Sequence, residues 1–133
     1  EYQNEPLPEV QADENELTAD QIAAKLNGLP KGRVPLGCQH LTMFIDVQQK
    51  LLFYVICAWG DDFSGAVLEY GAWPDPQRAY FSLRDVTKTL SSVTPGTGLE
   101  GAIYAGLQAL TERQLSREWQ REDGASLRIE RCL

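Results

Sequence analysis

The sequence predicts a mixed α/β domain of the α+β kind. We expect a three-stranded antiparallel meander, a crossover helix and a fourth strand parallel to the first. Residues 41–71 hold three apolar segments separated by short polar turns, which is typical of a meander. Residues 99–120 then carry apolar side chains at helical spacing, and an alternating segment follows. A crossover to a parallel strand needs about a dozen residues or more, which this helix supplies.

Charge divides the chain into two parts. The chain has 133 residues, which predicts one domain. The first 20 residues hold seven acids and neither Lys nor Arg, whereas the remainder has 12 acids and 12 bases. We therefore expect an acidic tail or linker over residues 1–20, a short helix and connection over 21–40, and the folded domain over 41–133. Because the chain starts at Glu1, we expect it to be cut from a longer polypeptide.

Composition excludes several classes of protein. A net charge of −7 that belongs to the tail argues against a domain that grips DNA through a strong basic face of its own. Three cysteines without a CxxC pair and a single histidine argue against a disulfide framework, a zinc site and a multi-histidine site. This cysteine usage predicts a reducing, intracellular compartment. The apolar run over 51–60 is far shorter than the roughly 20 residues of a membrane helix, so no membrane partner is expected.

Each element has its own signal in the sequence. Thr18 and Gln21 form a capping box that starts a short helix, which Gly28 closes. The strands of the meander are expected over 41–47, 51–59 and 64–71. Ser82 is the predicted cap of a short helix over 83–90. In the last segment, 125–133, alternation predicts one strand with these side chains on a shared face: Leu127, Ile129 and Arg131.

Asp46 is the sharpest candidate for chemistry. It stands near the end of an apolar strand, where a carboxylate is costly unless it is paired or holds a cation. Hard divalent cations prefer carboxylate oxygens held on a rigid scaffold. The alternative is that Asp46 caps the turn that follows Val47, and the strand pattern by itself favours this alternative.

Other polar residues have a structural interpretation beside a functional one. Glu69 could share a face with Asp46 and assist a metal site, although a solvated outward position is the commoner role. Asp61 and Asp62 are interpreted as turn residues, because neighbours on an extended chain point in opposite directions. His40 is interpreted as polar surface in a connection, with a phosphate or metal role as the alternative.

Aromatic and basic residues allow contacts with nucleic acid. Trp59 and Trp73 could stack on bases, but their places at strand ends favour packing at the edge of the core. Three arginines recur at intervals of four in the predicted helix: Arg113, Arg117 and Arg121. Such a stripe could follow a phosphate backbone, but neighbouring glutamates favour a solvated face.

The element order resembles the first half of a ribonuclease H-like fold. Over roughly residues 30–133, the chain also resembles the nuclease domain of the large terminase subunit of tailed phages, the lambda-like class. The motifs that carry this resemblance are Arg33-Val34-Pro35, Leu41-Thr42, Ile45-Asp46-Val47-Gln48, Ala58-Trp59-Gly60, Glu69-Tyr70-Gly71 and Asp123-Gly124 followed by Leu127 and Ile129. Asp-Val-Gln and Trp-Gly at this spacing form its most specific part.

The resemblance implies a metal-dependent DNA endonuclease of a phage or prophage, used in genome packaging. It assigns Asp46 to the first-strand carboxylate of a site for Mg²⁺ or Mn²⁺, with Glu69 as a lesser candidate. The family's other carboxylates would follow Leu133, so the domain is expected to be truncated at its C-terminal side and inactive alone.

The resemblance also implies a setting for the domain. Double-stranded DNA, the terminase small subunit and the portal are the implied partners. The parent would carry an ATP-binding motor domain and act in the host cytoplasm. Two alternatives stay open: a non-catalytic ribonuclease H-like interaction module, and a small prophage protein-binding domain with no nuclease history.

Overall fold

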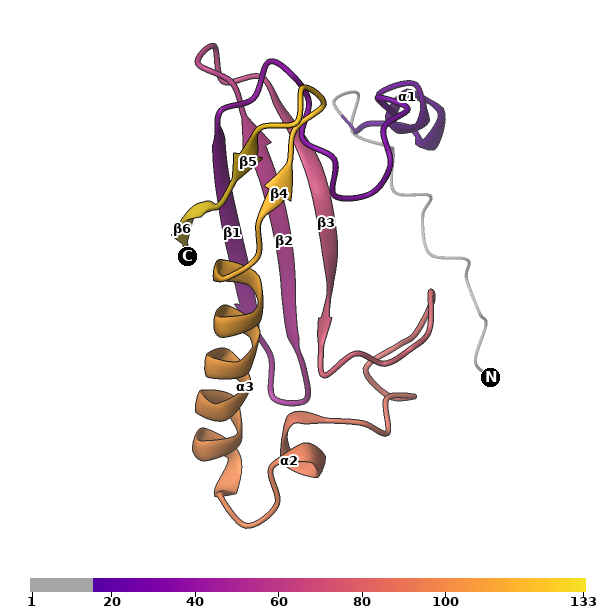
Figure 1. Ribbon diagram of the computed structural model, residues 1–133. Coiled ribbons are helices and arrows are strands. Elements are labelled where there is room, and N and C mark those ends of the chain that lie inside the picture. Colours follow the sequence, from indigo (N-terminus) through magenta and orange to yellow (C-terminus); the bar gives the residue numbers. More distant parts are fainter. Residues whose placement is uncertain (1–15) are drawn as a thin grey trace, which may run out of the picture.

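The computed structural model describes residues 16–133 (Figure 1), so the predicted acidic tail lies largely outside the described residues. Four strands form one sheet in the order β3-β2-β1-β6. Their bounds are His40–Val47 for β1, Leu52–Trp59 for β2, Gly65–Trp73 for β3 and Ile129–Cys132 for β6. The first three strands are antiparallel neighbours and β6 runs parallel to β1. The predicted meander and parallel fourth strand are therefore confirmed.

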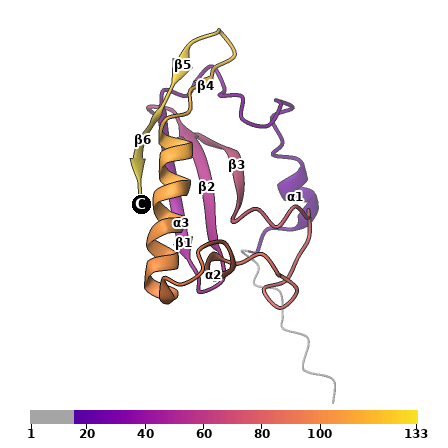
Figure 2. The ribbon, with the colours of Figure 1, turned by 60° about the horizontal axis from the view of Figure 1, so that its bottom comes forward.

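Helix α3, Gly98–Leu115, is the crossover and lies along one face of the sheet (Figures 1 and 2). Residues at intervals of four make its buried stripe: Ala102, Gly106, Leu110 and Gln114. The core lies between this stripe and the sheet face that carries Leu41, Met43 and Ile56, which are fully buried. Ala102 and Leu110 are the apolar side chains of this stripe and join the core cluster of Leu52 and Leu90, which seats α3 on the sheet.

The two shorter helices differ in how well the sequence predicted them. Helix α1, Ala19–Ala23, has the predicted capping box between Thr18 and Gln21. Helix α2, Leu90–Val93, is capped by Thr89, so the helix predicted over 83–90 was wrong. Ser82 instead donates a hydrogen bond to the Asp85 carboxylate across a short turn. The segment does not form a helix, because Val86 packs against Leu51 and Ala72 rather than against a neighbouring helical turn.

Helix α3 ends at Leu115, five residues before its predicted end at Gln120. The chain then forms β4, Trp119–Gln120, which pairs with β5, Ser126–Leu127. Trp119 enters the core with 1% of its surface exposed. The Val34 N–H also donates to the Gln120 carbonyl. Burial of the indole and this backbone pairing outweigh the local preference for helix.

The C-terminal segment also departs from its prediction. It is divided between β5 and β6, and the register shifts so that Leu41 pairs with Ile129 but Thr42 pairs with Arg131. Consecutive residues of a strand face opposite sides of a sheet. The prediction that Ile129 and Arg131 share a face was therefore wrong, because the bulge at Glu130 reverses the alternation.

The sheet face away from α3, called here the open face, is partly covered among the described residues. The rings of Phe53 and Phe81 stack with centroids 6.1 Å apart, so the connection after β3 covers the end of the face nearest the β1–β2 hairpin. Further along this face, large apolar side chains are exposed: Phe44, Trp59, Val67 and Tyr70. The two faces of the sheet thus have different surroundings, and this difference decides which candidate residues can act together.

Candidate functional site

Asp46 is the penultimate residue of β1 and pairs with Phe53 on the open face. The residue is exposed. Its Oδ2 accepts a hydrogen bond of 2.8 Å from Nε2 of Gln48, whereas the hairpin is closed by a backbone bond from Gln48 N–H to the Leu51 carbonyl. The contact of Asp46 is thus with a side-chain amide rather than with a turn N–H.

Strand β6 runs parallel to β1 and pairs with Leu41, Thr42 and Met43. The Leu133 N–H donates to the Met43 carbonyl at 2.9 Å, and the Ile45 N–H donates to the Leu133 carbonyl at 2.8 Å. Asp46 follows the last of these paired residues, near the carboxyl end of β1. In open α/β sheets such ends are where ligands commonly bind.

Glu69 lies on the opposite face of the sheet from Asp46. It pairs with Ile56, and Ile56 pairs with Met43, which is fully buried in the same core cluster as Trp119. Asp46 lies three positions after Met43 on the strand, so their side chains point to opposite faces. The expectation that Glu69 could share a face with Asp46 was therefore wrong.

A register shift is the physical reason for this reversal. Cys57 pairs with Val67 but Ile56 pairs with Glu69, so β3 has one extra residue at this point. Without the bulge Glu69 would continue the alternation of Val67 on the open face. The favoured interpretation, that Glu69 points outward into solvent, was also wrong, because only 8% of Glu69 is exposed.

Two donors hold the buried Glu69 carboxylate. Tyr54 Oη donates to its Oε1 and Arg117 Nη1 donates to its Oε2, each at 3.0 Å. Burial alone would raise the pKa of Glu69, but the hydrogen bonds from Arg117 and Tyr54 and the Arg117 charge lower it below its usual value. Burial and the neighbouring carboxylate raise the pKa of Tyr54 to about 12. Glu69 is thus an ionised anchor for Arg117.

The three arginines do not form the predicted stripe. Arg113 lies over the Trp73 ring at 5.9 Å, and Arg117 lies over the Trp119 ring at 3.8 Å. The third, Arg121, lies beyond the helix and pairs with Asp123 at 2.8 Å. The stripe fails because α3 ends before Arg117.

The two tryptophans considered for base stacking lie in different surroundings. Trp73 packs against the cluster beneath α3. Trp59 donates from Nε1 to Thr42 Oγ1 at 2.9 Å, so its ring lies along the open face. The preference for core-edge packing is thus confirmed for Trp73 and wrong for Trp59, which is exposed.

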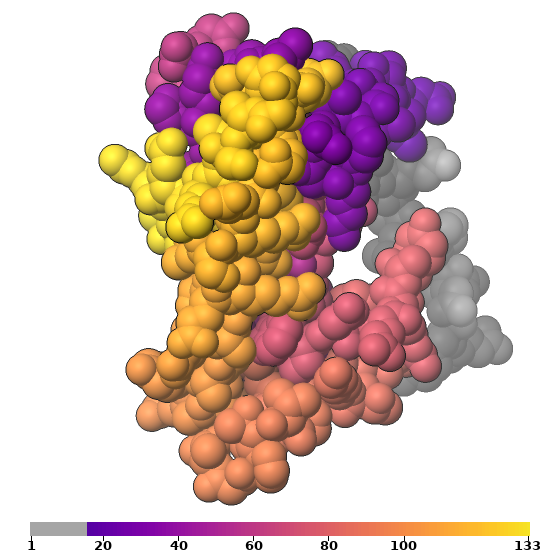
Figure 3. All heavy atoms as spheres, in the orientation of Figure 1, coloured from indigo at the N-terminus to yellow at the C-terminus, as the bar shows by residue number. Residues whose placement is uncertain are grey.

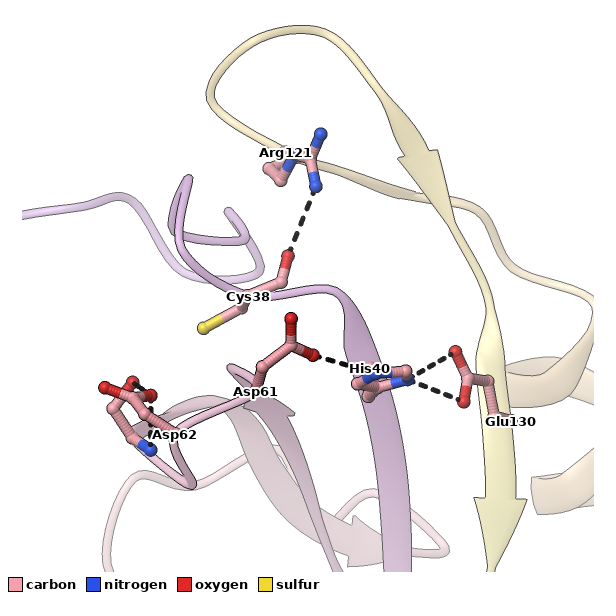
Figure 4. Close-up of polar contacts among 7 residues, drawn as sticks. Cys38, His40, Asp61, Asp62, Arg121 and Glu130 are labelled. Carbon is pink, nitrogen blue, oxygen red and sulfur yellow. Dashed lines mark hydrogen bonds and ion pairs between the residues drawn. The ribbon is translucent and has the colours of Figure 1, made fainter.

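His40 has contacts that sequence reasoning missed (Figure 4). Its Nδ1 lies 3.1 Å from Glu130 Oε2, and its Nε2 lies 3.6 Å from Asp61 Oδ1. The hydrogen bond and charge of Glu130, followed by Asp61, raise the pKa of His40. Asp62 behaves as the expected turn residue, accepting from the Ser64 N–H and hydroxyl. Glu130 lies 90 positions from His40, so no local signal could have found the pair.

Among residues 16–133, no group of three or more His, Cys, Asp or Glu side chains is arranged to hold a metal ion. In the same part of the chain, no helix is long and apolar enough to cross a membrane. Asp46 therefore stands as a single carboxylate at its end of the sheet. A single carboxylate still fits the donor chemistry of Mg²⁺, which proteins often hold through one or two carboxylates, waters and substrate phosphates.

The sheet order, the crossover helix and the parallel β6 define a ribonuclease H-like nuclease fold. A family model described as terminase large subunit gpA, endonuclease domain, matches residues 4–133. The chain therefore belongs to this family of phage DNA-packaging endonucleases. No curated protein and no solved structure matches the chain.

Proposed function

We propose that this domain is a metal-dependent endonuclease that cuts DNA during genome packaging, with Asp46 as a ligand of Mg²⁺ or Mn²⁺. The observation that carries the proposal is the exposed position of Asp46 near the carboxyl end of β1, the strand that pairs with the parallel β6. The endonuclease family supplies the reaction class. Glu69 is left out of the metal site, because its carboxylate is engaged by Arg117 on the other face.

The residues around Asp46 suit this role in two ways. Gln48 holds one carboxylate oxygen at 2.8 Å, which restricts the rotation of the carboxylate. Asp46 is exposed to solvent, so an ion can reach its carboxylate, while Phe81 covers the neighbouring Phe53. A divalent ion bound there would supply charge stabilisation and an activated water for phosphodiester hydrolysis.

The same proposal covers the partners of the domain. Double-stranded DNA is the substrate, and the terminase small subunit and the portal are packaging partners. An ATP-binding motor domain belongs to the same large subunit, which acts in the host cytoplasm. The endonuclease family of the chain supports this set of partners.

A non-catalytic ribonuclease H-like module is the second candidate function. The observation in its favour is that the described residues contribute one carboxylate at Asp46 and no three-residue metal group. For the same reason we propose that the 133-residue chain alone cuts DNA weakly or not at all, since two-ion chemistry needs several converging carboxylates.

Plasmid nicking by a terminase large subunit that contains this domain tests the proposal. With Mn²⁺ present, Asp46→Asn should reduce nicking to the level seen without protein, because the metal loses its charged ligand. Asp61→Asn is the matched control, since it removes the same charge at the other end of β1 and should nick like the wild type. Nicking by Asp46→Asn at the wild-type rate would contradict the proposal and favour the non-catalytic module.

A further inference from the structure

A groove runs between the connection that precedes β1 and the turn from α3 to β4. We propose that this groove binds backbone phosphates of double-stranded DNA, at a place separate from Asp46. Figure 3 shows the violet connection lying against the orange end of α3 and the hairpin that follows. The groove has a volume of about 190 Å³ and is lined by Lys31, Gly32, Arg33, Arg117, Glu118 and Trp119, among others.

Positive charge dominates the walls of the groove. Lys31, Arg33 and Arg117 line it, and the lining carboxylate, Glu118, is paired with Arg128 at 2.9 Å. Among residues 16–133, no carboxylate forms an ion pair with Lys31 or Arg33. A local excess of cations on a chain whose net charge is −7 marks a surface suited to an anionic ligand.

Arg117 is held in position before any ligand arrives. Glu69 accepts from its Nη1 at 3.0 Å, and the guanidinium stacks on Trp119 at 3.8 Å. The Arg117 side chain nevertheless stays 42% exposed, so part of its donor fork remains open. A planar guanidinium fixed by its neighbours matches the geometry of a phosphate.

Glycine at position 32 allows this arrangement. Its φ is +80°, and an added Cβ would lie 3.3 Å from Arg117 Nη2 and 3.4 Å from a ring carbon of Trp119. Arg117 Nη2 therefore lies over the Gly32 backbone at the wall of the groove. The Gly32 N–H donates to the Leu68 carbonyl at 3.0 Å, which ties the connection to β3.

The lining favours a nucleic-acid backbone over a free nucleotide. The Trp119 ring is buried and its face is occupied by Arg117, so it offers no stacking surface to a base. Cations from two separate segments suit a row of phosphates, whose contacts position DNA without reading its sequence. The groove proposal rests on the proposed function in one respect, since it takes DNA to be the anionic polymer that binds.

The groove and Asp46 lie on opposite faces of the sheet. Arg117 is anchored by Glu69 on the α3 face, whereas Asp46 belongs to the open face. DNA held in the groove is therefore a second contact of the domain and not the strand presented for cutting.

Fluorescence anisotropy with a labelled 20-base-pair duplex tests the groove on the 133-residue chain, in EDTA so that no metal takes part. Lys31→Ala combined with Arg33→Ala should lower the affinity about tenfold and reduce the salt slope by about 2, because each phosphate contact contributes about one unit. Both side chains are exposed, so the variant should fold. The matched control is Lys25→Ala with Arg78→Ala, which removes two exposed charges elsewhere and should bind like the wild type.

Arg117→Lys distinguishes the contribution of the stacked guanidinium group from that of its positive charge. It keeps the positive charge but loses the stacked guanidinium, so binding should weaken while the net charge is unchanged. Wild-type affinity for the double Lys31 and Arg33 variant would overturn the proposal. The proposal would also be overturned if inorganic phosphate shifted the NMR signals of Arg33 and Arg117 and the duplex did not shift them.

The outcome does not depend on the test of cleavage. The duplex assay in EDTA tests the groove variants alone, whereas the nicking assay tests Asp46→Asn. If the Lys31 and Arg33 variant loses duplex binding, the phosphate-binding groove is supported. If Asp46→Asn nicks plasmid like the wild type in the same study, the metal site alone is contradicted. The reverse pattern would contradict the groove alone.

Discussion

His40 is the single imidazole of the chain and lies between carboxylates of two other segments. Glu130 is on β6, and Asp61 is on the turn between β2 and β3. An imidazolium at this position links the start of β1 to both neighbours at one end of the sheet. Because the hydrogen bond with Glu130 raises the pKa of His40 in the folded state, this link depends on pH.

The sign of the dependence follows from the raised pKa. The contribution of His40 to stability is fully present below its unfolded pKa of about 6.5 and is lost as pH rises through the higher folded value. An NMR titration of the imidazole should therefore give a midpoint above about 6.5. Glu130→Gln should move that midpoint down, whereas Glu122→Gln removes the same charge elsewhere and should leave it unchanged. A wild-type midpoint at or below the ordinary value would contradict this pairing.

Gln114 is a polar residue inside the core. It is fully buried on the inner stripe of α3, and neither its Oε1 nor its Nε2 has a hydrogen-bond partner among the described residues. A buried amide without partners costs free energy that an apolar side chain of similar shape avoids.

We expect Gln114→Met to raise the free energy of unfolding by about 1 kcal/mol. Chemical denaturation of the 133-residue chain measures this change. Gln108→Met, at an exposed position of the same helix, should change stability by less than about 0.5 kcal/mol. A clear loss of stability in Gln114→Met would show that the amide has partners in solution.

Between elements, α3 packs closely against α2 and β2 at Gly106. A Cβ added there would lie 2.5 Å from Leu90 Cδ2 and 3.3 Å from Leu52 Cδ1. The absence of a side chain therefore lets α3 approach both elements. This contact is one reason why a glycine is accommodated in the middle of a helix despite its poor propensity.

Gly106→Ala should lower the free energy of unfolding by about 1–2 kcal/mol, because overpacking outweighs the gain in helix propensity. In a Leu90→Ala background the nearest clash is removed, so the further cost of Gly106→Ala should fall below about 0.5 kcal/mol. Equal costs in both backgrounds, measured by denaturant unfolding, would contradict the packing between α2 and α3.

At the scale of elements, the strands that a local sequence pattern defines could be predicted, whereas the places where tertiary contacts override that pattern could not. β1 and β2 are apolar with a short connection, so both their existence and their pairing could be predicted. The end of α3 could not be predicted, because burial of Trp119 and pairing with Val34 are tertiary effects. The face of Glu69 could not be predicted either, since the bulge after Ile56 leaves no mark in the sequence.

For the whole molecule, the sheet separates two surfaces with different chemistry. The open face carries Asp46 at one end and exposed aromatic side chains such as Phe44 and Tyr70 further along. The α3 side carries the cationic groove around Arg117. Asp46 could be singled out from the sequence and its resemblance, whereas the groove could not, because it joins segments more than 80 positions apart.

The position of a bound Mn²⁺ ion tests the proposed metal site most directly, and it can be read without any cleavage. Paramagnetic broadening of the NMR signals of the 133-residue chain locates an ion even when one carboxylate binds it weakly. Broadening should centre on Asp46 and Gln48 and disappear in Asp46→Asn, while Asp61→Asn should keep it. Broadening that persists in Asp46→Asn, or that centres on His40 and Glu130 at the other end of β1, would contradict Asp46 as the metal ligand.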